Sequence, residues 1–496
     1  MTCRPRHRAA LTALTLVAVL GGCSDSGVDR GANAVSPVNP GFVRLLAQAD
    51  KAMANGALAD AGQKLDEARS LSPDSPDLWL AIARLRLRGG EHLTALEAAD
   101  RALALGPDHA PVLLLRALMV RDAQGGTEAL TWFEAALEAD PDNPDILAEY
   151  AATLGDSGHA GAMLAAVRRL AEVAPKDPRV PYLQAVLAAR GGRYAIARSL
   201  LARSGMAARG VPAALLLDAV ISLEEGNADT AAVTLEPLVA RQPANTRLRE
   251  LLARAMLAEG RDGELVARFG AEAMLPEASP YLMMVVARAY ERGGDRTQAA
   301  RLLDRAYAGK SGGPVLLALR DGLPSPTAEA RGALLAGRSD DARDRAARLH
   351  AKLPASADVA NLVGDTMLGA GDPRGAMVAY ARAAEARRTW LLTRKAVWAQ
   401  ARLGNSQAAE AHLMRYVAGE TETASAVAAL ANHKAMRNDW TGAALLLDHA
   451  VRLGAGHDPA LLGQRLRAAQ ALGQHHDMRR FAGLLADVRP RSLAAR

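Results

Sequence analysis

The chain contains 496 residues, half of them hydrophobic, which is enough apolar surface for an extensive buried core. Alanine accounts for about one residue in five and aromatic residues for only 3 %, so the core has to be built by close approach of helices. Alanine and leucine are strong helix formers, which predicts an all-α fold. The formal net charge of +6 is too small to indicate a nucleic-acid partner.

Residues 1–22 have the three parts of a secretory signal peptide. Arg4, Arg6 and Arg8 form a basic start, Leu11 to Leu20 forms an apolar stretch, and small residues follow. A helix needs about 20 apolar residues to cross a bilayer, so this stretch is too short for a stable span. We therefore expect residues 1–22 to be cleaved, and the loss of three arginines lowers the net charge to +3.

The residues around the expected cleavage site resemble the lipobox of bacterial lipoproteins. They are Leu20-Gly21-Gly22-Cys23, although Gly21 replaces the more usual Ala or Ser. The resemblance implies that Cys23 becomes the lipidated first residue, with acyl chains such as palmitate that contribute about 0.8 kcal/mol per buried methylene to anchoring. Ser24, rather than Asp, after the cysteine implies an outer-membrane location facing the periplasm. The alternative is a plain secretory peptide with a chance cysteine.

Two further features complete the N-terminal part. The other cysteine, Cys3, leaves with the signal peptide, so the rest of the chain forms no disulfide and no thiolate metal site. Residues 23–41 are rich in Ser, Asp, Gly, Asn and Pro, and we expect them to form a flexible tether behind the lipidated cysteine.

A repeat of 34 residues dominates the chain from residue 42 onward. Small residues recur at this step in three columns, of which the first is alanine without exception: Ala49, Ala83, Ala117, Ala151, Ala185, Ala219, Ala253 and Ala287. The second column follows seven residues later, with Gln124 as its one departure: Gly56, Gly90, Gly158, Gly192, Gly226, Gly260 and Gly294. The third column, from which Met163 and Leu265 depart, is Ala61, Ala95, Ala129, Ala197, Ala231 and Ala299.

Prolines close several units at the same step, namely Pro73, Pro107, Pro141, Pro175 and Pro243. These columns resemble the tetratricopeptide repeat (TPR), a helix–turn–helix unit with small residues where its helices cross. Glycine leaves the first helix through a positive-φ turn, and proline ends the second. The resemblance implies a right-handed superhelical solenoid, in which each unit buries its face on its neighbours.

The register of the repeat divides the chain. About eight regular units occupy residues 42–313, and residues 314–322 form an irregular insertion that we expect to act as a kink. Looser units resume with Gly337, Gly371, Gly404 and Ala443 and end with a degenerate pair near Gly473, so a second array spans 323–490 before a tail at 491–496. The total is about 12–13 units.

No constellation of catalytic residues is found, so we expect no enzyme, no cofactor and no metal. Gly309-Lys310-Ser311 lacks the earlier glycine of a phosphate-binding loop, since Asp304 stands there. His475, His476 and Asp477 are adjacent, but without a recurring partner they are better explained as a solvated turn than as a metal site.

The TPR resemblance implies that the first helix of each unit lines a concave face and that the residue after the packing alanine enters the groove. The candidate binding residues are therefore Arg84, Tyr182, Arg254, Tyr281, Arg288, Arg331, Arg394, Trp398 and Arg467. Arginine and aromatic side chains together can hold an extended acidic peptide or an anionic polysaccharide. The alternative is that arginine is simply the commonest polar residue on these helices.

Three functional interpretations remain open. The first is a binding scaffold for protein or peptide partners, because a lipidated array resembles the TPR lipoproteins of bacterial exopolysaccharide synthesis and export, including the PEP-CTERM and exosortase systems. The second is a pilotin-like assembly factor for a pilus or secretin. The third is an accessory of an envelope-remodelling enzyme.

Overall fold

The computed structural model describes residues 39–243, 245–275, 278–308, 316 and 324–488. The expected signal peptide 1–22, the lipidation site Cys23, most of the tether, all of the insertion except Leu316 and the tail 491–496 lie outside the described residues. Across the described part the regular structure is entirely helical, with 26 α-helices and one short 3-10 helix, η1 (Ala455–His457). The all-α prediction is confirmed.

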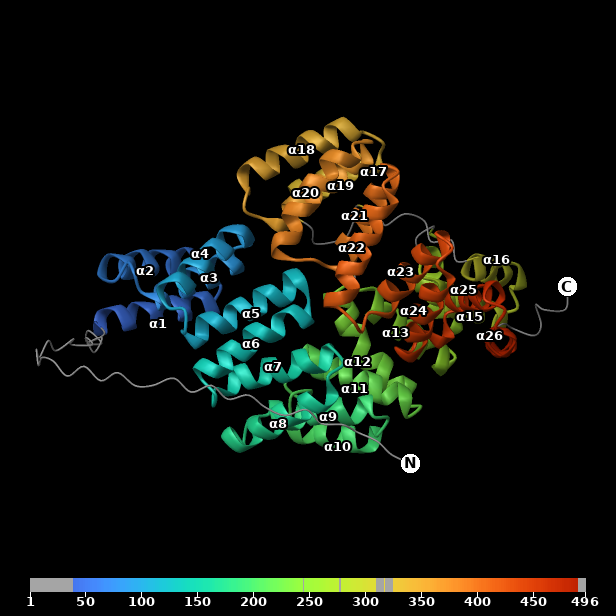
Figure 1. The fold of residues 1–496 in the computed structure, drawn as a ribbon, viewed down its shortest axis with the longest axis horizontal. Coiled ribbons are helices and arrows are strands. Elements are labelled where there is room, and N and C mark those ends of the chain that lie inside the picture. The colour runs from blue at the N-terminus through green and yellow to red at the C-terminus, as the bar shows by residue number, and fades with distance from the viewer. Residues whose placement is uncertain (1–38, 244, 276–277, 309–315, 317–323, 489–496) are drawn as a thin grey trace, which may run out of the picture.

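The helices form hairpins of two (Figure 1). The first array contains α1 (Pro40–Ala54), α2 (Leu58–Leu71), α3 (Pro76–Arg88), α4 (His92–Leu105), α5 (Ala110–Gln124), α6 (Gly126–Ala139), α7 (Pro144–Asp156), α8 (Ala160–Val173), α9 (Arg179–Arg190), α10 (Tyr194–Ser204), α11 (Pro212–Glu224), α12 (Ala228–Arg241), α13 (Thr246–Glu259), α14 (Asp262–Ala273), α15 (Pro280–Arg292) and α16 (Arg296–Ala308). The second array contains α17 (Ser325–Leu335), α18 (Ser339–Lys352), α19 (Ala357–Gly369), α20 (Pro373–Ala386), α21 (Trp390–Arg402), α22 (Ser406–Gly419), α23 (Ala424–Met436), α24 (Trp440–Arg452), α25 (Pro459–Ala471) and α26 (His475–Val488).

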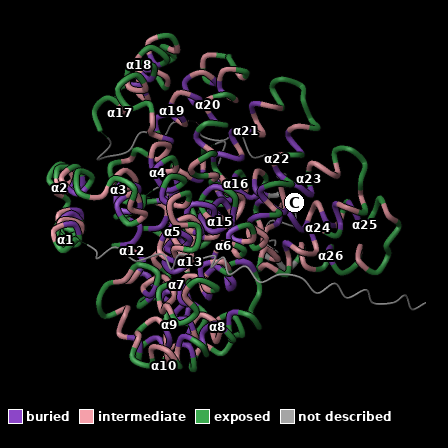
Figure 2. The backbone as a smooth tube through the Cα atoms, turned by 60° about the vertical axis from the view of Figure 1, so that its left-hand side comes forward, coloured by how far each residue is buried: buried purple, intermediate pink, exposed green. Residues whose placement is uncertain are grey.

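The alanine columns form the seam between the helices of each hairpin. Every alanine of the column from Ala49 to Ala287 is fully buried, and so is every alanine of the column from Ala61 to Ala299. Met163 and Leu265, the two departures from the second of these columns, are buried as well. Figure 2 shows the buried residues following the interior of the helix pairs while the turns are exposed. Small side chains at these crossings let the helix backbones approach, and each unit then packs on the next.

The glycine column ends the first helix of each unit, as predicted. Its members have φ between 68° (Gly192) and 84° (Gly226 and Gly294), a backbone conformation that residues with a Cβ atom rarely adopt. At the exception, Gln124, helix α5 continues to that residue and Gly125 makes the turn instead, with φ 109°. In the second array Asn438 occupies the matching turn with φ 62°, and it is the one residue other than glycine with positive φ in the described chain.

The second array folds back on the first rather than continuing away from it. Helix α20 packs against α4 and α5, α22 packs against α6, and α25 packs against α15 and α16 (Figure 1). The sequence predicts a kink between two arrays but not this return, because the repeat pattern describes only contacts between neighbouring units.

Candidate functional site

The candidate binding residues of the first array lie on the odd-numbered helices, on the face that carries the residue after each packing alanine. We call this surface the first-helix face. Arg84 on α3 is exposed, and its charge contributes to lowering the pKa of Asp77 after the larger effect of the His109 hydrogen bond. Arg254 on α13 and Arg288 on α15 are half-buried. The predicted positions are thus on one face, but their surroundings differ.

Arg254 and Tyr281 belong to one polar cluster. The Arg254 guanidinium lies 3.0 Å from the Glu224 carboxylate of α11. Burial raises the pKa of Tyr281, and the neighbouring charge of Arg254 opposes that increase. Glu250, one turn before Arg254, accepts a hydrogen bond from the Ser279 hydroxyl, and burial raises the pKa of its carboxyl group. The cluster offers donors, acceptors and an aromatic ring within three neighbouring units.

Tyr182 belongs to a second cluster nearer the start of the array. Burial raises the pKa of its phenol, and the charge of Asp156 adds to the effect. The Asp156 carboxylate lies 3.1 Å from the Arg190 guanidinium. Desolvation by the surrounding protein raises the pKa of Asp156, and the charge of Arg190 opposes that increase.

The remaining predicted residues are spread over the chain. Arg288 lies 3.4 Å from Glu291 on its own helix. Arg331 on α17 is half-buried, and burial lowers the pKa of its guanidinium. Arg394 and Trp398 lie on α21, where the Arg402 guanidinium lies 5.6 Å from the centre of the Trp398 ring. Arg467 on α25 is exposed. Of the nine predicted residues, Arg254 and Tyr281 are brought close enough for the charge of one to affect the pKa of the other.

Sequence reasoning missed a buried ionic network in the second array. The Lys395 ammonium of α21 donates to the Asp365 carboxylate of α19 at 2.7 Å, and both side chains are only 3 % exposed. The Tyr380 hydroxyl donates to the other Asp365 oxygen at 2.8 Å, and Lys395 also contacts the Asn361 amide oxygen at 3.1 Å. Desolvation raises the pKa of Asp365 to about 6 and lowers the pKa of Lys395. The hydrogen-bond partners of Asp365 and Lys395 therefore replace the water that would solvate these charges at the surface.

Lys395 carries a sequence signal that could have found it. Most of the corresponding positions in the earlier units hold apolar residues, among them Leu115, Leu183 and Val285, which are buried. A lysine in this column interrupts the buried stripe. A charged residue at such a position indicates a partner on a neighbouring helix.

The contacts between the two arrays were also not predicted from the sequence. Hydrogen bonds join helix ends and a turn of the first array to successive loops of the second. They include bonds from the Leu93 amide to the Ala355 carbonyl (3.0 Å), from the Arg388 amide to the Asp122 carbonyl (2.9 Å) and from the Thr421 hydroxyl to the Ser157 carbonyl (3.4 Å). Successive units of each array therefore pair in register. At this junction burial raises the pKa of the Glu420 carboxyl group, and the backbone amide of Gly126, at the start of α6, opposes that increase.

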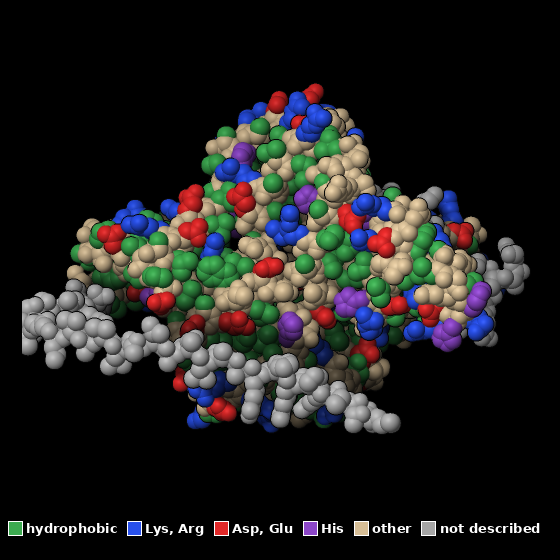
Figure 3. Space-filling model, viewed as in Figure 1, with side chains coloured by type: hydrophobic (Ala, Val, Ile, Leu, Met, Phe, Trp, Pro, Cys, Tyr) green, Lys and Arg blue, Asp and Glu red, His purple; other side chains and the backbone are tan. Residues whose placement is uncertain are grey.

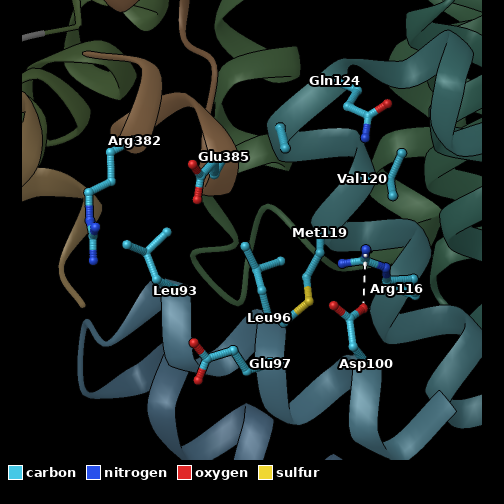
Figure 4. Close-up of a pocket in the computed structure, with 11 residues that line it drawn as sticks. Leu93, Leu96, Glu97, Asp100, Arg116, Met119, Val120, Gln124, Arg382 and Glu385 are labelled. Atoms are coloured by element: carbon cyan, nitrogen blue, oxygen red, sulfur yellow. Dashed lines mark ion pairs between the residues drawn. The ribbon is translucent and has the colours of Figure 1, made fainter. Parts of the chain in front are cut away.

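A pocket of about 470 Å³ lies at this junction, and we call it the junction pocket. Figure 4 shows its walls, formed by α4 and α5 of the first array and by α20 of the second. It is lined by Leu93, Leu96, Glu97, Asp100, Arg116, Met119, Val120, Ala123, Gln124, Arg382 and Glu385. A volume of this size accommodates a small ligand or a few side chains.

Among the described residues, no group of three or more His, Cys, Asp or Glu side chains is placed to hold a metal ion. His475, His476 and Asp477 form the first turn of α26, and the Asp477 carboxylate lies 2.8 Å from Arg465. None of the helices in the described part is sufficiently long and apolar to cross a bilayer. Basic and acidic side chains are interspersed over the face in Figure 3.

Comparison with known proteins identifies the repeat. A family model of the tetratricopeptide repeat matches residues 46–110 and, one unit later, residues 80–144. No protein of curated function matches the chain in sequence. Among solved structures, the chain is similar to PilW, a type IV pilus biogenesis factor, with 21 % identity over 43 % of this chain and 99 % of PilW and a TM-score of 0.35.

Two other solved structures show the same kind of likeness. PilF of Pseudomonas aeruginosa is 20 % identical over 43 % of this chain and 97 % of its own, with a TM-score of 0.35. Yeast Tom70 is 15 % identical over 88 % of this chain and 96 % of its own, with a TM-score of 0.32. These likenesses are limited to the helical-repeat fold.

Proposed function

We propose that this chain, a tetratricopeptide-repeat protein, is a non-catalytic scaffold that binds protein or peptide partners in the bacterial envelope. Stacked helical hairpins present an extended surface, and repeat proteins of this class bind protein partners on it. The observation that carries the proposal is the cluster of Glu224, Arg254, Glu250 and Tyr281 on the first-helix face. Half-buried tyrosines and charged groups can hydrogen-bond a peptide backbone and stack on its side chains.

The pairing of the arginines favours a peptide over a polyanion. Arg254 lies beside Glu224 and Arg288 lies beside Glu291, so their positive charges are balanced within the protein. An anionic polysaccharide would be repelled by these carboxylates at each arginine it approached. A peptide segment with both donors and acceptors can replace or extend the existing pairs without that repulsion.

The proposal includes a location and a process. Cys23 within Leu20-Gly21-Gly22-Cys23 supports lipidation, and Ser24 supports the outer membrane, with the repeats facing the periplasm. The process would be exopolysaccharide synthesis or export, on the resemblance to TPR lipoproteins of those systems. The Cys23→Ser variant tests the anchor: it should lose incorporation of a palmitate analogue and leave the membrane fraction, and unchanged labelling would contradict the lipobox.

Site-specific photocrosslinking in the full chain tests the binding surface. A photoreactive residue placed at Tyr281 or Tyr182 should form adducts with a reproducible set of envelope proteins identified by mass spectrometry. Val233 is the control position, because it is 74 % exposed on α12, a second helix of its unit. The double charge reversal Arg254→Glu and Arg288→Glu should reduce the Tyr281 adducts. Equal adducts from Val233, or none from either tyrosine, would reject the proposal.

A further inference from the structure

The junction pocket combines apolar walls from two helices of the first array with a cover from the second. Leu93 and Leu96 on α4 are half-buried, and Met119 and Val120 on α5 are buried but still line the space. Figure 4 shows Arg382 and Glu385 of α20 on the opposite side from these residues. The floor therefore suits an aliphatic side chain, which would gain from leaving water.

Both guanidinium groups in the pocket are already engaged. Arg116 lies 3.2 Å from the Asp100 carboxylate, and its guanidinium lies 5.7 Å from the centre of the Trp132 ring. Arg382 donates to the backbone carbonyl of Pro354 at 3.3 Å. Arg116 is therefore paired with a carboxylate, whereas Arg382 keeps its positive charge, because the carbonyl that it contacts is neutral.

Two carboxylates of the pocket have no such engagement. Glu97 on α4 and Glu385 on α20 are both exposed, and among the described residues neither has an ion-pair or hydrogen-bond partner. They come from different arrays and lie on opposite walls of the same pocket (Figure 4). The three acids and two arginines of the lining leave a net charge of −1, so the opening above the apolar floor is complementary to an aliphatic side chain next to a cation.

We propose that the junction pocket binds a peptide segment of a partner protein in which an aliphatic side chain stands beside lysine or arginine. The aliphatic side chain occupies the space over Met119 and Val120, and the neighbouring cation lies between Glu97 and Glu385. This inference rests on the scaffold function proposed above but places a second site away from the first-helix face. Because the lining comes from both arrays, the bound segment also holds the arrays together.

Fluorescence anisotropy on the full chain in detergent tests the pocket. The probes are two labelled peptides of equal length, one alternating lysine with leucine and one alternating glutamate with leucine. We expect the lysine peptide to bind and the glutamate peptide to bind at least about tenfold more weakly. The double variant Glu97→Arg and Glu385→Arg should weaken the lysine peptide by about tenfold, since two attractions become repulsions.

The matched control is Glu128→Arg with Glu138→Arg on α6, two exposed acids outside the pocket whose reversal changes the net charge by the same amount. It should bind the lysine peptide as the wild type does. The proposal is overturned if neither peptide binds, if both bind equally, or if the two double variants behave alike. Crosslinks from Tyr281 report the first-helix face separately, so failure of the pocket can be told apart from failure of the scaffold function.

Discussion

Gly125 and Gly419 lie backbone to backbone where the two arrays meet. A Cβ atom added at Gly125 would be 2.5 Å from the carbonyl oxygen of Gly419, and one added at Gly419 would collide with the carbonyl oxygen of Gln124. Backbone atoms cannot move aside as a flexible side chain can, so any residue larger than glycine at this contact has to push the arrays apart. The junction therefore depends on two glycines that are far apart in the sequence.

Gly419→Ala should open the junction while leaving each array folded. Gly419 ends α22, where alanine would ordinarily stabilise a helix by up to about 1 kcal/mol, so a local loss of stability is not expected. Small-angle scattering should show a larger radius of gyration, and the loops 353–356 and 420–423 should be cut faster by protease. Gly161→Ala in α8 is the control, because a Cβ there meets nothing within 4 Å. An unchanged radius of gyration for Gly419→Ala would contradict the prediction, because it would mean that the junction accommodates the added methyl group without separation of the arrays.

Lys395→Met should destabilise the second array by about 3–5 kcal/mol, because it leaves the Asp365 carboxylate buried without its cation. Hydrogen exchange of α19, α20 and α21 should quicken, whereas exchange in the first array should not change. The double variant Asp365→Asn and Lys395→Met is the control, since it removes both charges and should recover most of the loss. A single variant as stable as the wild type would show that the pair contributes nothing to holding these helices.

The same pair predicts a pH dependence. The pKa of Asp365 is about 6 in the folded chain and its ordinary value is 3.8, so between these pH values the folded chain keeps a proton that the unfolded chain has lost. The contribution of Asp365 to the free energy of unfolding is therefore fully present below about pH 4. It decreases as the pH rises to about 6, by about 3 kcal/mol at most. The double variant should lack this decrease when urea unfolding is compared across the interval. Identical pH profiles would argue against a raised pKa.

Local repeat chemistry was predictable because it acts within one unit. Ala83 and Gly90 each have a fixed role in a hairpin, namely a tight crossing and a positive-φ turn, and the structure places both as the sequence predicts. Even in the irregular unit at Gln124, a glycine with positive φ makes the turn after the first helix, because Gly125 takes that role one residue later. Residues that act across the junction have no such local signature. Nothing near Gly419 in the sequence indicates that Gly125 lies against it.

For the candidate binding residues, the sequence predicted the helix face but not the partners or the burial of the side chains. The column after the packing alanine does hold Arg254 and Arg288, but the pairing of these arginines with Glu224 and Glu291 depends on side-chain placement across a turn or between units. The same column contains Asp365, which is buried with Lys395 instead of facing a groove. A residue's column therefore predicts its helix face but not whether a neighbouring helix covers it.

Asn438→Gly should stabilise the hairpin of α23 and α24 by about 0.5–1 kcal/mol. Asn438 makes the turn that glycine makes in the other units, and its φ of 62° strains a residue with a Cβ. Glycine adopts this φ without strain, which stabilises the folded chain. Its greater conformational entropy in the unfolded chain offsets only part of that stabilisation. Asn438→Ala should act in the opposite direction, because alanine lacks the local hydrogen bonding that lets asparagine tolerate this conformation. Hydrogen exchange of α23 and α24 measures both variants, with α3 and α4 as the internal reference. Equal exchange rates in the two variants would mean that the turn carries no strain.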